Sequence, residues 1–310
     1  MPVPNYPKVL TYGHQGTENV FTGQILVEEK IDGSQIGFGF DEDGILCIRS
    51  HNQQIPLDQG IEVIPKMFRT AVRIIEERMT EKWERFFYGS MWIYGEYLEG
   101  PHHNVLSYDR TPEGHIVLFD AILDGYWALY SELLEIAELL GFECVPLLFA
   151  GEVANSTALA THLCAKPLLG GEIVEGVVVK NYHQLISLNG QVTPVFAKIV
   201  NEKFQESHGV TWNKLSPIQA VLESVSSEAR WAKAVQRRLE AGELLNAPQD
   251  IGPLLKSIQI DFEAEEADDI ARLLYKALRK DVLKAVTKGF AQWYKDRLVE
   301  RADALAGKGV

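Results

Sequence analysis

A single amine, Lys30, stands among acids in the stretch ILVEEKIDGSQIGFGF. An unprotonated lysine amine can attack an electrophile and form a covalent intermediate. A free lysine titrates at about 10.4, however, and nearby carboxylates raise that pKa. Strand alternation places Glu28 and Asp32 on the face that carries Lys30 and sends Glu29 to the other face. Gly33 would let the backbone approach a bound ligand closely. Taken alone, the pattern is more typical of a solvated strand lysine, so its chemistry depends on partners elsewhere.

Four further short motifs carry candidate partners for Lys30. They are IYGEYLEG with Glu96, IVLFDAI with Phe119, EGVVVK with Glu175 and Lys180, and VFAKIV with Lys198. Each of these residues also has a plainer interpretation, as a turn acid, a core aromatic or a solvated strand end. A bound metal together with Lys180 and Lys198 would supply a positive field that offsets the acids around Lys30. The five motifs taken together therefore favour a chemical role for Lys30 more strongly than any one motif does.

The order of these motifs, and the interval from Lys30 to Lys198, resemble the covalent nucleotidyltransferase superfamily of polynucleotide ligases and RNA-capping enzymes. Within it, residues 5–205 are most similar to the RNA ligases typified by the bacteriophage nick-sealing RNA ligase and the trypanosome RNA-editing ligases. The resemblance implies ATP-dependent joining of RNA 3′-hydroxyl and 5′-phosphate ends through lysyl-AMP and RNA-adenylate intermediates, with Mg²⁺ or Mn²⁺. Nick sealing or RNA repair on duplex or nicked RNA is the expected use.

The same resemblance implies the residues that perform the chemistry. Lys30 corresponds to the nucleophile that attacks the α-phosphorus of ATP, and Asp32 belongs to the same motif. Lys198 corresponds to a lysine that contacts the α-phosphate, where negative charge grows in the transition state. Glu175 corresponds to the acid that helps to hold the divalent metal.

It also implies the residues that bind the substrates. Glu96 matches the acid that binds a ribose hydroxyl, and Phe119 matches the aromatic that stacks on adenine, with Val177 on the other face. Arg49 in CIRSH matches an arginine that engages the phosphate or the RNA end, a use that suits its guanidinium fork; a surface arginine is the plainer interpretation. The full expected set of ATP-binding residues is Glu28, Lys30, Gly33, Arg49, Glu96, Phe119, Val177, Lys180 and Lys198. His102 and His103 in GPHHN are candidates for metal or RNA contact, although loop histidines without spaced partners usually do neither.

One motif departs from the family pattern. The last motif normally reads Lys-x-Lys, whereas this chain has Lys198-Ile199-Val200. Three consequences are open: Lys198 and Lys180 suffice, Lys203 in NEKF reaches back, or the chemistry is weakened.

The secondary-structure signals of the sequence differ between the first two thirds of the chain and the last third. Up to about residue 205, short β-rich runs alternate with two segments of helical spacing, 61–79 and 127–141, and the latter has Gly141 as its stop. An EDG turn predicts an antiparallel hairpin after Lys30. These signals favour an α+β fold: a nucleotidyltransferase (ATP-grasp-like ligase) domain, residues 1–208, of antiparallel sheets flanked by helices. Residues 209–310 are rich in helix formers and predict an all-α C-terminal domain with a possible RNA-binding role.

The C-terminal third carries a different charge from the rest. Residues 209–310 hold 16 Lys and Arg against 15 Asp and Glu, a net charge of +1, which leaves −14 for residues 1–208. In this third, Lys276, Lys280 and Lys284 recur every four residues and share a slowly rotating helix face. This face is a candidate for the RNA sugar–phosphate backbone; a solvated amphipathic face is the plainer interpretation.

The composition bears on the cellular location that we expect for the protein. The chain has no apolar run near the roughly 20 residues of a membrane helix, and its N-terminus lacks the pattern of a secretory signal. Its three cysteines are widely spaced, which disfavours a disulfide framework and makes a reducing cytoplasm the expected location. The expected partners are RNA ends; no membrane and no obligate protein partner is indicated.

Other functions stay open on the sequence alone. Within the superfamily, the alternatives are a DNA nick ligase and a capping-type guanylyltransferase, although the helical texture after residue 209 favours the RNA-ligase branch. Val200 motivates an alternative of another class, a catalytically weak RNA-end-binding protein. The RNA strand itself is open between a nicked duplex, a broken tRNA and a free end, as are the oligomeric state and the pathway.

Overall fold

The protein is described by a computed structural model that covers residues 2–82, 90–103, 106–188, 190–201, 218, 221–222 and 225–306. The chain divides into two compact units. Unit 1 comprises Met1–His208 and Ser227–Asp261, and unit 2 comprises Gly209–Ser226 and Phe262–Val310. The predicted boundary between residues 208 and 209 lies outside the described residues. That residues 1–208 and 209–310 are separate domains stays a prediction.

The larger sheet of unit 1 is antiparallel along its main path. Its strand order is β5-β4-β3-β6-β7-β8, and β9 pairs in parallel with β7. The strands are β3 (Ser34–Phe40), β4 (Leu46–Ser50), β5 (Gln54–Ile55), β6 (Met91–Tyr97), β7 (Ile116–Leu123), β8 (Tyr126–Trp127) and β9 (Glu143–Cys144). The predicted hairpin is confirmed, since β3 and β4 pair antiparallel around a turn in which Gly44, at φ 73°, donates to the carbonyl of Asp41.

The second sheet of unit 1 has the order β1-β12-β11-β2-β10. Its strands are β1 (Leu10–Thr11), β2 (Ile25–Lys30), β10 (Leu147–Gly151), β11 (Gly176–Leu188) and β12 (Gln191–Val200). All of its pairings are antiparallel except that of β1 with β12. Strands β2 and β11, which carry Lys30 and Lys180, are therefore neighbours although about 150 residues separate them in sequence.

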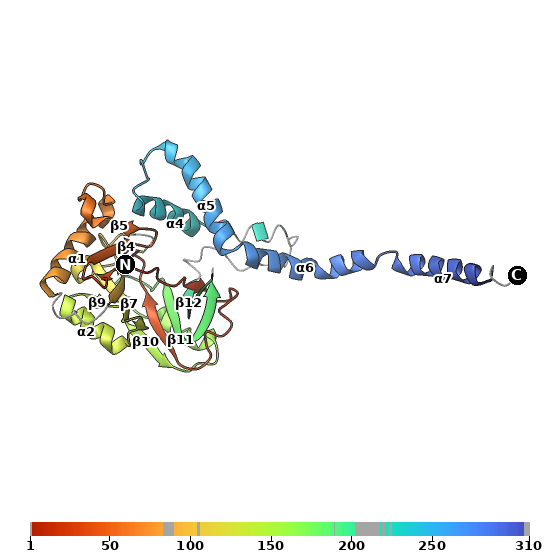
Figure 1. The fold of residues 1–310 in the computed structure, drawn as a ribbon, viewed down its shortest axis with the longest axis horizontal. Helices are drawn as coiled ribbons and strands as arrows, with labels where there is room; N and C mark the ends of the chain where they lie inside the picture. The colour runs from red at the N-terminus through yellow and green to blue at the C-terminus, as the bar shows by residue number, and fades with distance from the viewer. Residues whose placement is uncertain are drawn as a thin grey trace. The chain divides into compact units, whose positions relative to one another are not determined.

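Two helices cover the larger sheet, and both follow from the helical spacing of the sequence. The first segment is a short 3-10 turn, η2 (Lys66–Phe68), followed by α1 (Arg69–Lys82); the helix starts late because Pro65 favours the position just before a helix over its interior. The second is α2 (Tyr130–Leu140), which ends at Gly141 in a left-handed conformation, as predicted. Apolar side chains of both helices and of β3, β4, β6 and β7 form one core. Figure 1 shows α1 and α2 beside β7 and β9.

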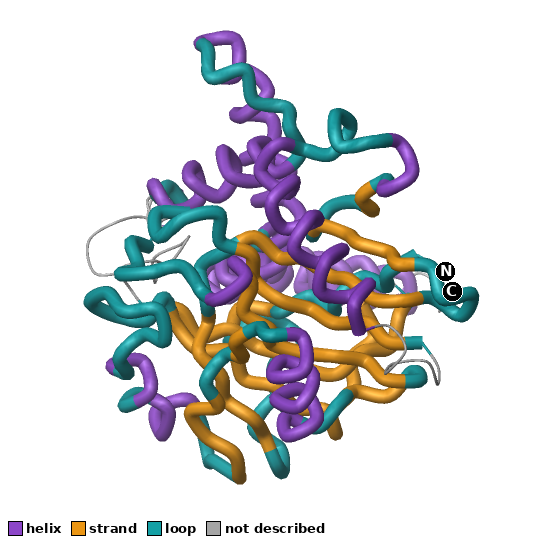
Figure 2. Tube along the Cα trace, turned by 90° about the vertical axis from the view of Figure 1, so that its left-hand side faces the viewer, coloured by secondary structure: helices purple, strands orange, loops and turns teal. Residues whose placement is uncertain are grey.

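The C-terminal third is helical, as predicted. It contains α4 (Glu228–Glu240), α5 (Ile251–Glu265), α6 (Ala267–Thr287) and α7 (Phe290–Ala306). Short 3-10 turns elsewhere are η1 (Leu57–Gln59), η4 (Glu113–His115), η5 (Ser156–Leu159), η6 (His162–Cys164) and η8 (Pro248–Asp250). The α+β class, with mainly antiparallel sheets and C-terminal helices, is confirmed, and Figure 2 distinguishes the strands (orange) from the helices (purple). Among the described residues, no helix is long and apolar enough to cross a membrane.

Candidate active site

Lys30 is the last residue of β2, and its partner Glu175 directly precedes β11. The Lys30 Nζ donates a hydrogen bond to Glu175 Oε2 at 2.6 Å, and the two side chains are 25% and 15% exposed. The pairing follows from sheet register, because Lys30 lies opposite Gly176, the residue after Glu175. The fold therefore brings together the amine and the acid that the sequence assigns to one nucleotide site, although they are 145 positions apart in sequence.

Three acids hold Lys30 in its charged form. Burial works against the ammonium, but the negative charges of Glu175, Asp32 and Glu96 outweigh it and raise the pKa of Lys30 well above its usual value. The same cluster raises the pKa of Glu175: burial disfavours its carboxylate more than Lys30 and Lys198 favour it. Without a bound nucleotide, Lys30 is thus an ammonium ion and cannot act as a nucleophile.

Glu96 lies on β6 beside the segment that follows Lys30. Burial raises its pKa to about 8, against the opposing effect of Lys30. Its Oε2 atom is buried and makes no hydrogen bond among the described residues. Gly33 accounts for the close approach, since a Cβ atom there would lie 2.9 Å from the Tyr97 carbonyl oxygen and 3.2 Å from the Glu96 Cβ. Gly33 therefore allows the backbone to pass against β6, in addition to any approach by a nucleotide.

Asp32 fixes the loop that follows β6. Its Oδ2 accepts a hydrogen bond from the Leu106 N–H at 2.7 Å, and its own N–H donates to the Tyr108 hydroxyl at 2.8 Å. These two contacts join the segment after Lys30 to residues that are more than 70 positions away. In the structure Asp32 orders the rim of the site as well as adding negative charge near Lys30.

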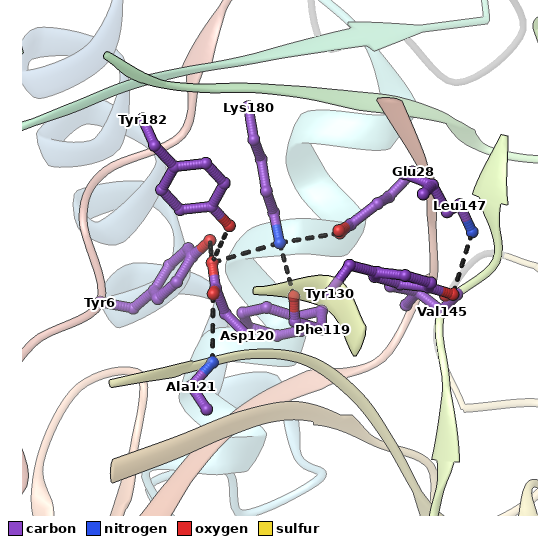
Figure 3. A network of polar contacts seen from close by, with 10 residues as sticks. All are labelled: Tyr6, Glu28, Phe119, Asp120, Ala121, Tyr130, Val145, Leu147, Lys180 and Tyr182. Atoms are coloured by element: carbon purple, nitrogen blue, oxygen red, sulfur yellow. Dashed lines mark hydrogen bonds and ion pairs between the residues drawn. The ribbon is translucent and has the colours of Figure 1, made fainter. Parts of the chain in front are cut away.

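Lys180 and Glu28 form a second, deeply buried cluster (Figure 3). Lys180 Nζ lies 2.7 Å from Glu28 Oε2 and 3.2 Å from Asp120 Oδ2, and all three side chains are at most 3% exposed. Lys180 also donates to the carbonyl oxygen of Phe119 at 2.5 Å. Burial raises the pKa of Glu28 to about 7 although Lys180 opposes the shift. Two expected ATP-binding residues, Glu28 and Lys180, thus form an ion pair with each other in this structure.

Two tyrosines complete the buried cluster. The hydroxyls of Tyr6 and Tyr182 both donate to Asp120 Oδ2, at 2.8 and 3.0 Å (Figure 3). Burial and the negative charge of Asp120 raise the pKa of both phenols, so that they remain donors. Sequence reasoning missed Asp120, Tyr6 and Tyr182. An acid inside the apolar run VLFDAIL was a usable signal for Asp120, because a lone acid in a buried strand requires partners.

Phe119 and Val177 occupy different surroundings. The Phe119 ring packs edge-on against Tyr6 at a centroid distance of 4.9 Å, and Lys180 Nζ lies 5.5 Å from the ring centre. Phe119 is half-buried, which leaves part of the ring accessible. Val177 is fully buried in the core of the smaller sheet. Their contacts with adenine stay a prediction.

Arg49 and Lys198 have different neighbours. Arg49 is buried, and its three guanidinium nitrogens donate to the backbone carbonyls of Ser50, Val3 and His51. It therefore holds the N-terminal segment against β4, and its contact with RNA or phosphate stays a prediction. Lys198 lies on β12, and its positive charge partly opposes the rise in the pKa of Glu175 that burial causes.

Val200, which stands where the family motif has its second lysine, is among the described residues. Val200 lies opposite Gly176 in the pairing of β12 with β11, directly beside Glu175. Lys203, the proposed substitute, lies outside the described residues. That Lys198 and Lys180 suffice without a second motif lysine stays a prediction.

The donor atoms near Lys30 suit a hard divalent cation. Mg²⁺ and Mn²⁺ prefer carboxylate and phosphate oxygens, and Mg²⁺ is usually held by one or two carboxylates together with substrate phosphates. Glu175 and the unpartnered Oε2 of Glu96 are such donors. Within the described residues, no group of three or more His, Cys, Asp or Glu side chains is arranged to hold a metal unaided. The residues therefore fit a cation that arrives with a phosphate-bearing ligand.

The predicted RNA-contacting lysines belong to unit 2. Lys276, Lys280 and Lys284 are all exposed on α6. Their spacing along one helix is confirmed, and their contact with RNA stays a prediction.

Comparison with known proteins identifies the family. Residues 23–200, more than half of the chain, match the RNA ligase family. The match contains β2 with Lys30, β6 with Glu96, and β11 and β12 with Glu175 and Lys198. The chain belongs to the RNA ligase family. No curated protein matches it.

Several solved structures share a weaker likeness with the chain. An aspartate-to-alanine mutant of Naegleria gruberi RNA ligase without ligand is 13% identical, with a TM-score of 0.45, and the alignment covers 64% of this chain and 55% of that one. A lysine-to-methionine mutant of the same protein with AMP and Mn is 14% identical, with a TM-score of 0.45 and coverages of 65% and 57%. A lysine-to-alanine mutant with ATP and Mn is 13% identical, with a TM-score of 0.43 and coverages of 63% and 56%. The chain thus spans little more than half the length of these relatives.

Proposed function

We propose that the protein is an ATP-dependent RNA ligase that joins 3′-hydroxyl and 5′-phosphate ends through a lysyl-AMP intermediate on Lys30. The observation that carries the proposal is the contact between Lys30 and Glu175, flanked by Glu96 and Asp32, inside the segment that matches the RNA ligase family. The lysine and its acids all lie close together, and all of them belong to the segment that matches the RNA ligase family. The expected cytoplasmic location belongs to the same proposal.

The first step is the transfer of AMP to Lys30. The Lys30 amine attacks the α-phosphorus of ATP, an N–P bond forms, and the P–O bond to pyrophosphate breaks. The lysine must lose its proton before it attacks, since only the free amine is a nucleophile. Lys198 supports the negative charge that grows on the α-phosphate. A divalent cation held by Glu175 and the ATP phosphates would neutralise charge in this acidic site.

The remaining steps transfer AMP to RNA and then release it. A 5′-phosphate oxygen of the RNA attacks the lysyl-AMP phosphorus, which frees Lys30 and leaves an RNA-adenylate. The 3′-hydroxyl of the other end then attacks the 5′-phosphorus, the phosphodiester forms, and AMP leaves. A nicked or otherwise duplex RNA is the substrate that we favour, with the exposed lysines of α6 as its backbone contacts.

Covalent labelling tests this proposal at its first step. Incubation with ATP labelled at the α-phosphate and Mg²⁺ or Mn²⁺ should mark the wild-type protein, and Lys30→Ala should abolish the label because the nucleophile is gone. Lys66→Ala, at an exposed lysine of η2, is the matched control and should keep the label. A label that persists on Lys30→Ala would reassign the nucleophile.

The substrate is tested by parallel assays. GTP in place of ATP separates a capping-type guanylyltransferase from a ligase, because only the former would form a lysyl-GMP adduct. Matched nicked RNA, nicked DNA and single-stranded RNA then separate RNA ligation from DNA ligation. RNA binding with no adduct from either nucleotide would support the alternative of a catalytically weak RNA-end-binding protein, which Val200 motivates.

A further inference from the structure

Helix α4 brings a carboxylate to the segment that follows Lys30. The Ser34 hydroxyl donates to Glu240 Oε1 at 2.5 Å, across 206 residues of sequence, and both side chains are buried. Ser34 starts β3, four residues after Lys30. Glu240 is the last residue of α4, and both residues belong to unit 1. A helix outside the family-matched residues 23–200 therefore contacts the nucleophile motif directly.

The hydrogen bonds around Ser34 form a single consistent chain. His103 Nδ1 accepts a hydrogen bond from the Glu99 N–H at 3.0 Å, so a neutral His103 carries its proton on Nε2. That Nε2–H donates to Ser34 Oγ at 2.8 Å, which leaves the Ser34 proton to be given to Glu240. Gln236, one turn before Glu240, donates to the same Oγ at 3.1 Å. The Ser34 hydroxyl thus donates one hydrogen bond, to Glu240, and accepts two, from His103 and Gln236. These three side chains hold it in position.

The face of α4 that is buried in unit 1 carries charged side chains. Glu240 is 7% exposed and Arg230 2%, whereas Trp231, Val235 and Leu239 on the opposite face are 42–49% exposed. An amphipathic helix that packed for hydrophobic burial would turn the apolar face inward. Specific hydrogen bonds, including the one to Ser34, are a reason for the observed orientation.

The contact lies directly behind the candidate active site. Gly33 passes against Glu96 and Tyr97 on β6, and Ser34 pairs with Tyr97 in the next register position. The Glu240 charge is also among those that raise the pKa of Glu96. Any displacement of Ser34 would therefore move the residues that connect Lys30 to β3.

We propose that Glu240 is a positioning residue for the adenylylation of Lys30, acting through Ser34 rather than on ATP. This inference rests on the proposed function. Catalysis is sensitive to placement, since a misplacement of about 1 Å can cost about 100-fold in rate. The docking of α4 thereby makes the first chemical step depend on a helix that lies beyond the family-matched segment.

Single-turnover adenylylation tests the proposal. Glu240→Ala should lower the rate of enzyme–AMP formation by about 10-fold to 100-fold, with little change in the ATP concentration that gives half the maximal rate. Glu240→Gln should restore most of the rate, because the amide oxygen still accepts from Ser34. Ser34→Ala should reproduce the loss, and the double variant Ser34→Ala/Glu240→Ala should be no slower than either single variant. Glu243→Ala, at an exposed acid just after α4, is the matched control and should match the wild type.

Hydrogen exchange without ATP gives a second, activity-independent readout. Backbone amides of residues 31–36 should exchange faster in Glu240→Ala than in Glu243→Ala. Wild-type adenylylation with equal rates in Glu240→Ala would overturn the positioning role while leaving the proposed function intact. If the wild type formed no adduct, the proposed function would fail, and unchanged exchange at residues 31–36 would then overturn the positioning role independently.

Discussion

The charge on Lys30 is the main chemical constraint at the scale of single residues. Glu175, Asp32 and Glu96 stabilise the ammonium form, whereas attack on phosphorus requires the free amine. Binding of a polyanion such as ATP without a cation would add more negative charge and raise the lysine pKa further. Under the proposed mechanism, Lys198 and a divalent cation would offset this negative charge and lower the pKa of Lys30.

The pKa of Lys30 can be changed without removing the amine. Glu175→Gln removes the nearest negative charge but keeps an amide oxygen near Nζ. Because a nearby carboxylate favours the ammonium, its removal should lower the Lys30 pKa by about one unit or more. The measurement is the pH at which Lys30 becomes half-reactive towards an amine-selective acylating reagent, without ATP and metal.

An exposed acid in the same loop supplies the control for this measurement. Glu172→Gln changes the net charge equally but lies at a solvent-exposed position, so the Lys30 midpoint should stay near that of the wild type. An unchanged midpoint in Glu175→Gln would show that Glu175 does not set the charge of Lys30.

At the scale of elements, the buried cluster around Lys180 joins the two sheets of unit 1. Glu28 on β2 and Lys180 on β11 belong to the smaller sheet, whereas Phe119 and Asp120 on β7 belong to the larger one. Lys180 therefore crosses from one sheet to the other with an ammonium that two carboxylates and a carbonyl satisfy. Lys30 and Glu96 lie on the same two sheets, so the cluster helps to determine the spacing of the active-site residues.

Removal of the Lys180 charge should destabilise the protein strongly. Lys180→Met leaves Glu28 and Asp120 buried without their cation, which costs about 3–5 kcal/mol in the free energy of unfolding. Urea unfolding at neutral pH measures the loss. Lys180→Met/Glu28→Gln should recover part of it, because one uncompensated charge is removed.

The matched control for Lys180 is a lysine on a helix surface. Lys280→Met on α6 should change the free energy of unfolding by less than about 0.5 kcal/mol. A similarly small effect of Lys180→Met would refute the view that the cluster ties the sheets together.

At the scale of the whole molecule, charge is distributed unevenly along the chain. Residues 1–208 carry a net charge of −14, whereas residues 209–310 carry +1. An acidic catalytic segment repels the RNA backbone, so local groups of cations must provide the attraction. Under the proposed function, the exposed row of Lys276, Lys280 and Lys284 on α6 would be such a group.

The α6 lysines should act on RNA binding and not on adenylylation. Replacement of all three with glutamine should weaken binding of a nicked RNA duplex and reduce the slope of log affinity against log salt by about 2, because phosphate contacts are lost. The rate of enzyme–AMP formation should remain that of the wild type. Fluorescence anisotropy at several salt concentrations measures the slope.

A variant of equal charge change separates local contact from net charge. Lys8, Lys66 and Lys166 are exposed lysines of unit 1, and their joint replacement with glutamine changes the total charge equally. Equal weakening by the two triple variants would mean that α6 has no specific role in binding RNA.

The sequence by itself determined the strands, the helices and the motif residues of this protein. Alternation and helical spacing are local properties, so the hairpin after Lys30, the stop at Gly141 and the helical C-terminal third could all be predicted from them. Motif order was sufficient to associate Lys30 with Glu175, because family motifs converge on one site.

Only the tertiary structure decided which partner each buried charge takes. Sequence alternation places Glu28 on the same face as Lys30, yet the fold gives Glu28 to Lys180 and Glu175 to Lys30. It also gives Asp120 and Glu240 partners that no local pattern indicates, because ion pairs and hydrogen bonds form between residues that are 60 to 206 positions apart. Partner choice depends on sheet register and helix docking, which arise from packing across the whole of unit 1 and not from any short stretch of chain.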